Sequence, residues 1–395
     1  MKRIQTGLEN ILANPPARLE NKRIGLLCNP ASVDGRLRHA SRLAKERFGK
    51  RLAALFSPQH GLYAEKQDNM IESDDFIDPV LRIPVFSLYG KTRRPTSEMM
   101  DAIDVLLVDL QDAGTRVYTF FTTLSYCLEE AARHGKPVFV LDRPNPAGGD
   151  TVEGNCLRPG FASFVGRYPM PMRHGLSIGE YALWINDCHG IGCELEITAM
   201  TGWRRSMRFR ETGLYWIPPS PNLPTPESAL VYPGQVMWEG TNVSEGRGTT
   251  QPFELFGAPY FDIDGILAFM GGSRQEGCYL RPAVFEPVAH KWQGRACRGF
   301  QIHVTDGRAF SAWTVSMKLL AAVIRHHGPE AGGVFEWKQP PYEYEFEKLP
   351  IDLILGDDTI RKTLEAGENI DERIRLWNEE AGTFREATRP CRLYE

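Results

Sequence analysis

Short apolar runs alternate with amphipathic stretches along the first half of the chain. The apolar runs predict five strands, at Ile24–Cys28, Leu52–Phe56, Ile83–Leu88, Val105–Leu110 and Val138–Leu141. Helical patterns fall between them, as at Arg38–Phe48 and at Phe120–His134, the latter closed by Gly135 and Pro137. Strands that alternate with helices form βαβ units. This half therefore predicts a Rossmann-like, mostly parallel sheet with helices on both faces.

A proline-rich passage, residues 217–226, predicts the boundary between two domains. It serves equally well as a linker or as a rigid mount that presents Asn222 to a ligand. Beyond it we expect a strand at Gly299–Val304, a helix at Ala312–His326 and a closing helix near Glu372–Arg385. The sequence thus predicts an α/β fold with an N-terminal domain over residues 1–226 and a smaller α+β C-terminal domain over residues 227–395.

Polar, turn-forming residues follow each of the five predicted strands. Parallel strands end at the same edge of a sheet, and open α/β sheets bind their ligands beyond that edge. The clearest example is Asp109–Thr119, which carries more polar and charged side chains than a simple turn needs: Gln111, Asp112, Arg116 and Tyr118. Because loops held by a rigid sheet commonly carry function, we expect a binding site here.

Composition narrows the class of protein. Hydrophobic residues make up 42% of the chain, charged residues 24%, and the net charge is −4, as in an ordinary globular protein without affinity for nucleic acid. No apolar stretch follows the N-terminus, and no later run reaches the length of a membrane span. The eight cysteines are scattered without a CxxC pair, which is typical of reduced thiols. We expect a cytoplasmic protein that binds neither nucleic acid nor membrane.

The motifs that bind common cofactors are absent from the sequence. GxGxxG does not follow the first strand and GxxxxGK[ST] occurs nowhere, which argues against NAD, FAD and ATP. A nucleotide-dependent transferase would fit the sheet but not these missing motifs. The histidines lack the spacing of a metal site, and no GxSxG motif of a serine hydrolase is present. We expect no cofactor and no metal.

Carboxylates are plentiful in and beside the predicted loops, at Glu65, Glu72, Asp109, Asp112, Asp142, Glu153, Glu180, Glu239, Glu245 and Glu254. Glycoside hydrolysis needs two of them, one protonated to release the leaving group and one ionised to attack or to activate water. Any single one could instead cap a helix or pair with an arginine. The arginines that could hold a carboxylated ligand through two parallel hydrogen bonds are Arg116, Arg143, Arg173 and Arg247.

A set of motifs in consistent order from about Gly25 to the C-terminus carries a family resemblance. They are Phe56–Gly61 (FSPQHG), Leu88–Lys91 (LYGK), Asp109–Thr119 (DLQDAGTRVYT), Leu141–Pro146 (LDRPNP), Val152–Gly154 (VEG), Arg173–Gly175 (RHG) with Gly179 and Glu180, Pro219–Asn222 (PSPN), Asn242–Thr250 (NVSEGRGTT) and Pro252–Glu254 (PFE). Together they resemble the NamZ-type exo-β-N-acetylmuramidases, glycoside hydrolase family 171.

This resemblance implies a Rossmann-like N-terminal domain, a smaller C-terminal domain and an active site in the cleft between them. The implied reaction, in peptidoglycan recycling, releases N-acetylmuramic acid from the non-reducing end of peptidoglycan fragments, so the expected partner is a small sugar. The oligomeric state stays open. We expect the substrate-binding residues to be Gln59, His60, Arg116, Tyr118, Asn145, Arg173, His174, Asn222, Glu239 and Arg247.

One departure from the family pattern affects the chemistry. Many relatives carry glutamate where this chain has Gln59, and that glutamate is the family's favoured catalytic candidate. Because glutamine neither donates nor accepts a proton at neutral pH, another acid must act here, or activity is altered or lost. We nominate Glu72, with Asp112 and Glu245 as the next contenders. A non-catalytic sugar- or muropeptide-binding protein on the same scaffold is the alternative, for which Gln59 argues.

Overall fold

The computed structural model describes residues 3–68 and 70–395 and is built around a seven-stranded sheet. The sheet has the order β3-β4-β2-β1-β5-β6-β9. Its strands are β1 (Ile24–Cys28), β2 (Leu52–Ser57), β3 (Phe76–Ile77), β4 (Pro84–Ser87), β5 (Val105–Asp109), β6 (Val138–Leu141) and β9 (Leu195–Thr198). All neighbouring pairs are parallel except β3 with β4. The parallel strands follow the Rossmann order 3-2-1-4-5-6, with the reversal between β1 and β5.

Helices cover both faces of this sheet, as the sequence predicts. On one face lie α1 (Gly7–Ala13) and α2 (Ala40–Phe48); on the other lie α3 (Ser97–Asp101), α4 (Phe120–Arg133) and α5 (Ile178–Cys188). The side chains of β1 alternate between the two layers: Leu26 packs with the α1 and α2 side, and Leu27 packs with the α4 side. All five residues of β1 are therefore buried, which explains its continuous apolar run.

The second half contains an antiparallel sheet and six helices within the described residues. The sheet order is β10-β13-β12-β11, with β10 (Leu255–Ala258), β11 (Arg274–Gln275), β12 (Cys278–Phe285) and β13 (Cys297–Val304). The helices are α6 (Pro226–Gln235), α7 (Ile263–Met270), α8 (Ala312–His327), α9 (Pro350–Leu355), α10 (Asp358–Glu365) and α11 (Ile370–Ala387). The predicted α+β character, strand and two helices are confirmed. No helix in the described ranges is long and apolar enough to cross a membrane.

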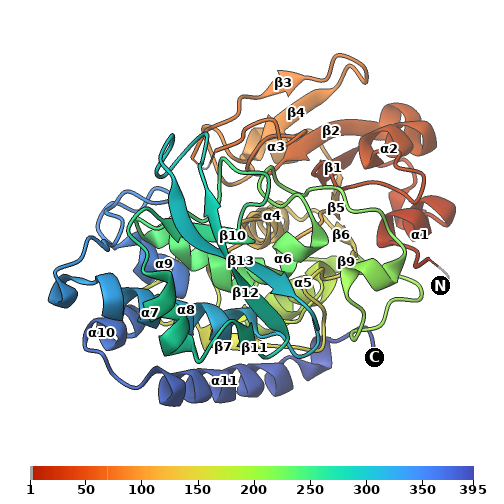
Figure 1. Cartoon of the computed structure of the whole chain (residues 1–395). Coiled ribbons are helices and arrows are strands. Elements are labelled where there is room, and N and C mark those ends of the chain that lie inside the picture. Colours follow the sequence, from red (N-terminus) through yellow and green to blue (C-terminus); the bar gives the residue numbers. More distant parts are fainter. Residues whose placement is uncertain (1–2, 69) are drawn as a thin grey trace.

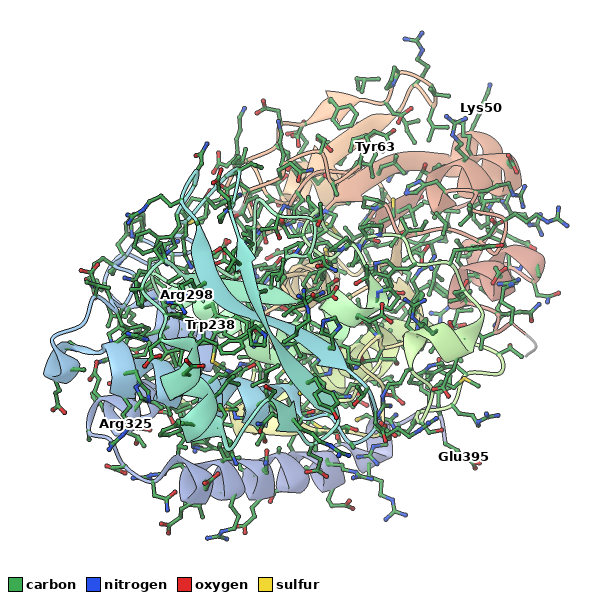
Figure 2. All side chains as sticks on the ribbon, viewed as in Figure 1. Lys50, Tyr63, Trp238, Arg298, Arg325 and Glu395 are labelled. Carbon is green, nitrogen blue, oxygen red and sulfur yellow. The ribbon has the colours of Figure 1, made fainter. Side chains whose placement is uncertain are left out.

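The two halves are closely joined. Side chains of α4 and α5 share one continuous hydrophobic cluster with those of α6 and α8. The last long helix, α11, packs against β7 (Glu153–Cys156), which pairs with β8 (Pro171–Arg173) in the first half of the chain. Figure 1 shows α11 running along one side of the molecule. From the end of α11 the chain returns toward the N-terminal half. Side chains fill the space between these layers, with Trp238 fully buried among them (Figure 2).

The C-terminal residues bind to the N-terminal half. The Tyr394 hydroxyl donates to Asp142 Oδ2 at 2.6 Å and accepts from the Met200 backbone N–H at 2.9 Å. The backbone N–H of Leu393 donates to Glu180 Oε1 at 2.9 Å. Because Asp142 follows β6 directly, the C-terminal tail is fastened at the carboxyl end of a central strand.

Replacing Tyr394 with phenylalanine is therefore expected to lower the free energy of unfolding by about 1–3 kcal/mol, because a buried carboxylate and a backbone N–H each lose a hydrogen bond. Urea unfolding of wild type and variant measures this difference. Tyr215→Phe is the matched control, since Tyr215 is 64% exposed and its hydroxyl is not needed for packing. Equal urea midpoints for wild type and Tyr394→Phe would show that the tail contributes nothing to stability.

Candidate active site

A small pocket lies beyond the carboxyl ends of β2 and β5, between the two halves of the chain. Its polar lining comes from the segment after β2, the segment after β5, the proline-rich passage and the C-terminal half: Gln59, His60, Tyr118, Thr119, Ser220, Asn222, Tyr232, Glu239, Arg247, Tyr342 and Glu343. The enclosed space is about 30 Å³, room for one or two water molecules. Side chains of the lining must move before a sugar ring can enter.

Glu239 and Arg247 line one wall of the pocket, with Glu245 and Lys291 directly behind them. Arg247 Nη2 donates to Glu239 Oε1 at 2.6 Å, and Arg247 Nε lies 3.2 Å from Glu245 Oε1. Lys291 Nζ donates to Glu245 Oε2 at 2.8 Å. Burial acts to lower the pKa of Arg247, but Glu239 and Glu245 outweigh it and raise that pKa above its ordinary value. The guanidinium therefore stays charged.

Local backbone features place this wall. Glu239 belongs to the 3-10 helix η4 (Val236–Gly240), which is anchored by Trp238 stacked on Phe256 with ring centroids 5.2 Å apart. Arg247 lies between two glycines with positive φ angles, Gly246 and Gly248. A Cβ at Gly246 would lie 2.4 Å from a backbone oxygen, so only glycine allows this loop to pass so close.

One nitrogen of Arg247 is left without a partner. Arg247 lines the pocket, and its buried Nη1 has no hydrogen-bond acceptor among the described residues. A buried N–H without an acceptor costs free energy, and such groups in native structures are rare. The pocket therefore offers a charged, oriented donor to an anionic or strongly polar group of a ligand.

A second carboxyl group enters the pocket from the other side. Glu343 Oε1 accepts from Gln59 Nε2 at 3.0 Å, and Glu343 Oε2 accepts from the Tyr89 hydroxyl at 2.7 Å. Gln59 Oε1 in turn accepts from the Thr119 hydroxyl at 2.6 Å. Burial of Glu343 raises the pKa of its carboxyl group above the ordinary range. The site thus holds one carboxylate paired with arginine and one carboxyl held by neutral donors.

His60 and Asn222 complete the side of the pocket next to β2. Burial lowers the pKa of His60 to about 4, and its Nδ1 lies 2.8 Å from the Lys66 carbonyl oxygen. A neutral imidazole therefore faces the pocket at neutral pH. Asn222 Nδ2 donates to the Gln67 carbonyl oxygen at 3.1 Å, which ties the proline-rich passage to the segment after β2.

Six of the ten expected substrate-binding residues line this pocket: Gln59, His60, Tyr118, Asn222, Glu239 and Arg247. The other four lie outside its lining in the described residues and bond to the protein itself. Arg116 donates to four backbone carbonyls, and Arg173 pairs with Glu153. Asn145 donates to the Leu176 carbonyl at 2.9 Å, and His174 Nδ1 accepts from the Leu176 N–H at 3.1 Å.

The three nominated catalytic carboxylates are also outside the pocket lining within the described ranges. The side chain of Glu72 is 52% exposed and lies 3.4 Å from Arg93. Asp112 is fully buried, accepts from the Gly114 N–H and has no partner for Oδ2 in the part of the chain that the structure describes. Glu245 is held by Arg247 and Lys291 behind the pocket wall.

Glu239 and Glu343 are the carboxylate residues that do line the pocket. Sequence reasoning named Glu239 but missed Glu343. The run Tyr342–Glu345 follows two prolines in a segment that has the composition of an ordinary charged loop. The two prolines beside aromatic residues were the available signal of a rigid, functional segment.

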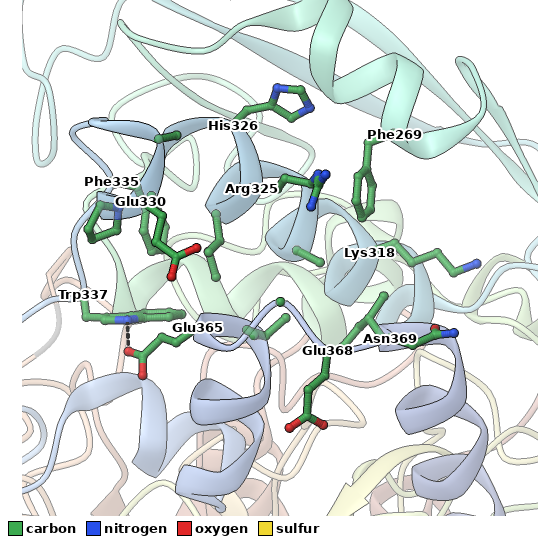
Figure 3. A pocket seen from close by; sticks show the side chains of 18 of the residues that line it. Phe269, Lys318, Arg325, His326, Glu330, Phe335, Trp337, Glu365, Glu368 and Asn369 are labelled. Carbon is green, nitrogen blue, oxygen red and sulfur yellow. Dashed lines mark hydrogen bonds between the residues drawn. The ribbon is translucent and has the colours of Figure 1, made fainter.

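A larger groove lies elsewhere on the C-terminal half and contains none of the expected site residues. It has a volume of about 1290 Å³ and is bordered by α7, α8, α10 and α11 (Figure 3). Three of its charged side chains bond within the lining: Glu365 accepts from Trp337 Nε1 at 2.8 Å, and Lys318 lies 2.7 Å from Asp371. Because open α/β folds bind ligands at strand ends, we regard the small pocket as the candidate active site.

Comparisons with known proteins identify the family of this chain. The family models described as exo-beta-N-acetylmuramidase NamZ, N-terminal and C-terminal, match residues 24–227 and 230–394. The peptidoglycan beta-N-acetylmuramidase NamZ of Bacillus subtilis (strain 168) is 38% identical over 393 residues, covering 99% of this chain and 92% of that protein. Two crystal structures of DUF1343 family proteins from Bacteroides fragilis NCTC 9343 match all of this chain and 99% of theirs. Their TM-scores are 0.88 and 0.76, at 32% and 27% identity.

Fold, pocket and relatives together define a glycoside hydrolase, so the alternative of a non-catalytic binding protein loses its support. The chain belongs to the exo-β-N-acetylmuramidase NamZ family, as its motifs predict.

Proposed function

We propose that this enzyme releases N-acetylmuramic acid from the non-reducing end of peptidoglycan fragments. Family membership supports the reaction class, and the unpartnered Nη1 of Arg247 in the pocket is the observation that carries the substrate. N-acetylmuramic acid differs from N-acetylglucosamine by a lactyl ether that ends in a carboxylate. A guanidinium is the side chain best suited to bind such a group.

The charges around the pocket support an anionic substrate. Arg247 and Lys291 balance Glu239 and Glu245 within the wall, and Glu343 is the further carboxyl group in the lining. Burial raises the pKa of Glu343, which weakens its repulsion of a substrate carboxylate relative to an exposed glutamate. We propose that Nη1 of Arg247 donates to the lactyl carboxylate.

Domain organisation and location belong to the same proposal. We place the domain boundary near residue 226, with the active site in the cleft between the halves; the family models, which meet between residues 227 and 230, support this. We place the enzyme in the cytoplasm, as part of peptidoglycan recycling. All eight cysteines are free, and seven of them are buried, which fits a reducing compartment.

Substrate selectivity tests the proposed function. The purified enzyme is expected to hydrolyse a 4-nitrophenyl β-N-acetylmuramide and to act roughly 10- to 150-fold more slowly, in kcat/KM, on its lactyl methyl ester. This loss corresponds to about 1.5–3 kcal/mol for one charge-assisted hydrogen bond. The matching β-N-acetylglucosaminide, which lacks the lactyl group, should be slower still.

Product analysis on longer glycans completes this test. Release of single N-acetylmuramic acid units from the non-reducing end is the expected pattern. Equal rates on all three chromogenic substrates would contradict the role of the lactyl carboxylate, and internal fragments from long glycans would contradict exo action.

A further inference from the structure

We propose that Glu343 is the general acid of this active site and that Gln59 is its positioning residue. This inference rests on the proposed glycosidase function and goes beyond it, because it assigns the acid that position 59 lacks in this chain. Four observations carry it: the path of the segment that bears Glu343, its backbone conformation, its hydrogen bonds, and the second carboxylate in the same pocket.

Residues 339–348, here called the strap, reach from the C-terminal half to the segments that follow β2 and β4. The Glu343 backbone N–H lies 3.2 Å from Met70 Sδ. The neighbouring Tyr344 hydroxyl donates to Glu72 at 2.9 Å, and the Arg93 guanidinium lies 3.9 Å from the centre of the Tyr344 ring. The strap therefore closes over the pocket and is held on both sides of Glu343.

The strap adopts an unfavourable backbone conformation at the residue that enters the pocket. Glu343 and Tyr344 have φ angles of 46° and 67°, in the left-handed region that favours glycine. Each such residue costs on the order of 1–3 kcal/mol and persists where surrounding contacts impose it, commonly at functional sites. The strained segment places the carboxyl group of Glu343 in the pocket, beside Tyr342 of the same strap.

The hydrogen bonds define what Gln59 does. Because the Gln59 oxygen accepts from Thr119, its amide NH₂ is turned toward Glu343 and can only donate. A glutamate at position 59 would have no amide to donate, so the two carboxyl groups could meet only by sharing a proton or by repelling each other. Gln59 and Glu343 thus form a donor–acceptor pair across the pocket.

Glu239, the second carboxylate in the pocket lining, supplies the other group that glycoside hydrolysis needs. Glu239 pairs with Arg247 and accepts from the Tyr342 hydroxyl at 2.9 Å, whereas Glu343 is bonded to an amide and a phenol, so a cation is in direct contact with Glu239 but not with Glu343 among these partners. As the bond between the anomeric carbon and the leaving oxygen breaks, its electron pair goes to that oxygen, which takes the proton of Glu343. A water molecule then attacks the anomeric carbon and gives one proton to the carboxylate of Glu343, which restores its carboxyl group. The carboxylate of Glu239 stabilises the positive charge that develops on the sugar.

The titratable groups around Glu343 act in both directions. Burial is the largest influence and raises the pKa of its carboxyl group, Tyr89 and Arg93 lower it, and Glu239 raises it. The other titratable side chains of the pocket lining are His60 after β2, Tyr118 after β5, Tyr232 on α6, Arg247 and, on the strap itself, Tyr342. Loss of the Glu343 proton is therefore expected to set the alkaline limb of kcat/KM.

Glu343→Gln is the central test, with two substrates that differ in their leaving group. On a disaccharide, whose sugar leaving group needs a proton, kcat is expected to fall roughly 10²- to 10⁴-fold with little change in KM. On 4-nitrophenyl β-N-acetylmuramide the loss should be far smaller, because 4-nitrophenolate leaves without a proton. The alkaline limb should also disappear. Glu347→Gln, on the exposed part of the strap, is the matched control and should keep wild-type rates.

Two further variants guard against misfolding and test positioning. Glu343→Asp keeps an acid and should recover part of the disaccharide activity, which a purely structural role would not explain. Gln59→Leu removes a donor that lowers the pKa of Glu343, so the alkaline limb of kcat/KM should move to higher pH.

Other outcomes overturn the inference. If Glu343→Gln is as active as wild type or more active on both substrates, the strap only covers the pocket. If Gln59→Glu raises turnover and makes Glu343→Gln harmless in that background, position 59 is the true acid site. If wild type cleaves neither substrate at any pH, the proposed function fails together with this inference. If wild type cleaves both substrates while Glu343→Gln, Glu343→Asp and the control Glu347→Gln all have the same activity, only the role of Glu343 fails.

Discussion

Replacing Arg116 with methionine is expected to lower the free energy of unfolding by about 3–5 kcal/mol. The guanidinium is almost fully buried and donates from Nη1 to the carbonyls of Asn155 and Met170, both at 2.9 Å. From Nη2 it donates to Ile354 at 3.0 Å and Leu355 at 2.7 Å. Methionine would fill much of the space but leave four buried carbonyl oxygens without this donor.

Activity separates this structural role from the substrate-binding role that the sequence suggests for Arg116. At a low urea concentration, at which Arg116→Met remains folded, its KM for the substrate should equal that of wild type. The reason is that Arg116 does not line the pocket. Arg158→Met is the matched control: its side chain is 44% exposed and pairs with Asp357 and Glu380, so its loss should cost less than about 1 kcal/mol. A rise in KM without a loss of stability in Arg116→Met would instead place Arg116 at the substrate.

Replacing Asp112 with asparagine is expected to make stability less dependent on pH. Burial raises the pKa of Asp112 to about 7. In the folded state the carboxyl group therefore keeps its proton up to about pH 7, whereas in the unfolded chain it loses that proton near pH 4. The contribution of Asp112 to stability is full below pH 4 and is lost as the pH rises to 7. The total loss is on the order of 4 kcal/mol.

The asparagine variant does not ionise, so its free energy of unfolding relative to wild type should rise steadily between pH 4 and 7 and then level off. Urea unfolding at four pH values in this interval measures the trend. Asp104→Asn is the contrasting control, because its pairing with Arg23 lowers the pKa of Asp104 to about 2, so stability is lost there as the pH falls. Parallel pH curves for wild type and Asp112→Asn would show that Asp112 is already ionised in the folded state.

Much of the Rossmann-like half could be predicted because its strands are buried on both faces. Such strands leave a continuous apolar run, and all five predicted strands are found with each end within one residue. The two strands that were not predicted lie at the sheet edges: β3 has only two residues, both exposed, and all four residues of β9 are only partly buried. Its sequence Leu195–Thr198 therefore carries little apolar signal.

Site residues could be predicted where they directly follow a predicted strand, because the sheet then places them at its edge. Gln59, His60 and Tyr118 follow strands of known register, so the sheet itself brings them to one edge. Arg116 lies two residues from Tyr118 yet turns into the core, where two of its four acceptors come from α9, more than 230 positions away in the sequence. Glu343 meets Gln59 across 284 positions, and no local pattern reports such a contact.

The fastening of Tyr394 to Asp142 has a consequence for how the chain folds during synthesis. The two residues are 252 positions apart, and a ribosome that adds roughly 5–20 residues per second needs roughly 13–50 s to pass from one to the other. During that interval β6 and its neighbours can pair, but Asp142 still lacks the phenol that covers it. Until the C-terminal tail has been synthesised, the nascent N-terminal half lacks this hydrogen bond and remains accessible to chaperones and proteases.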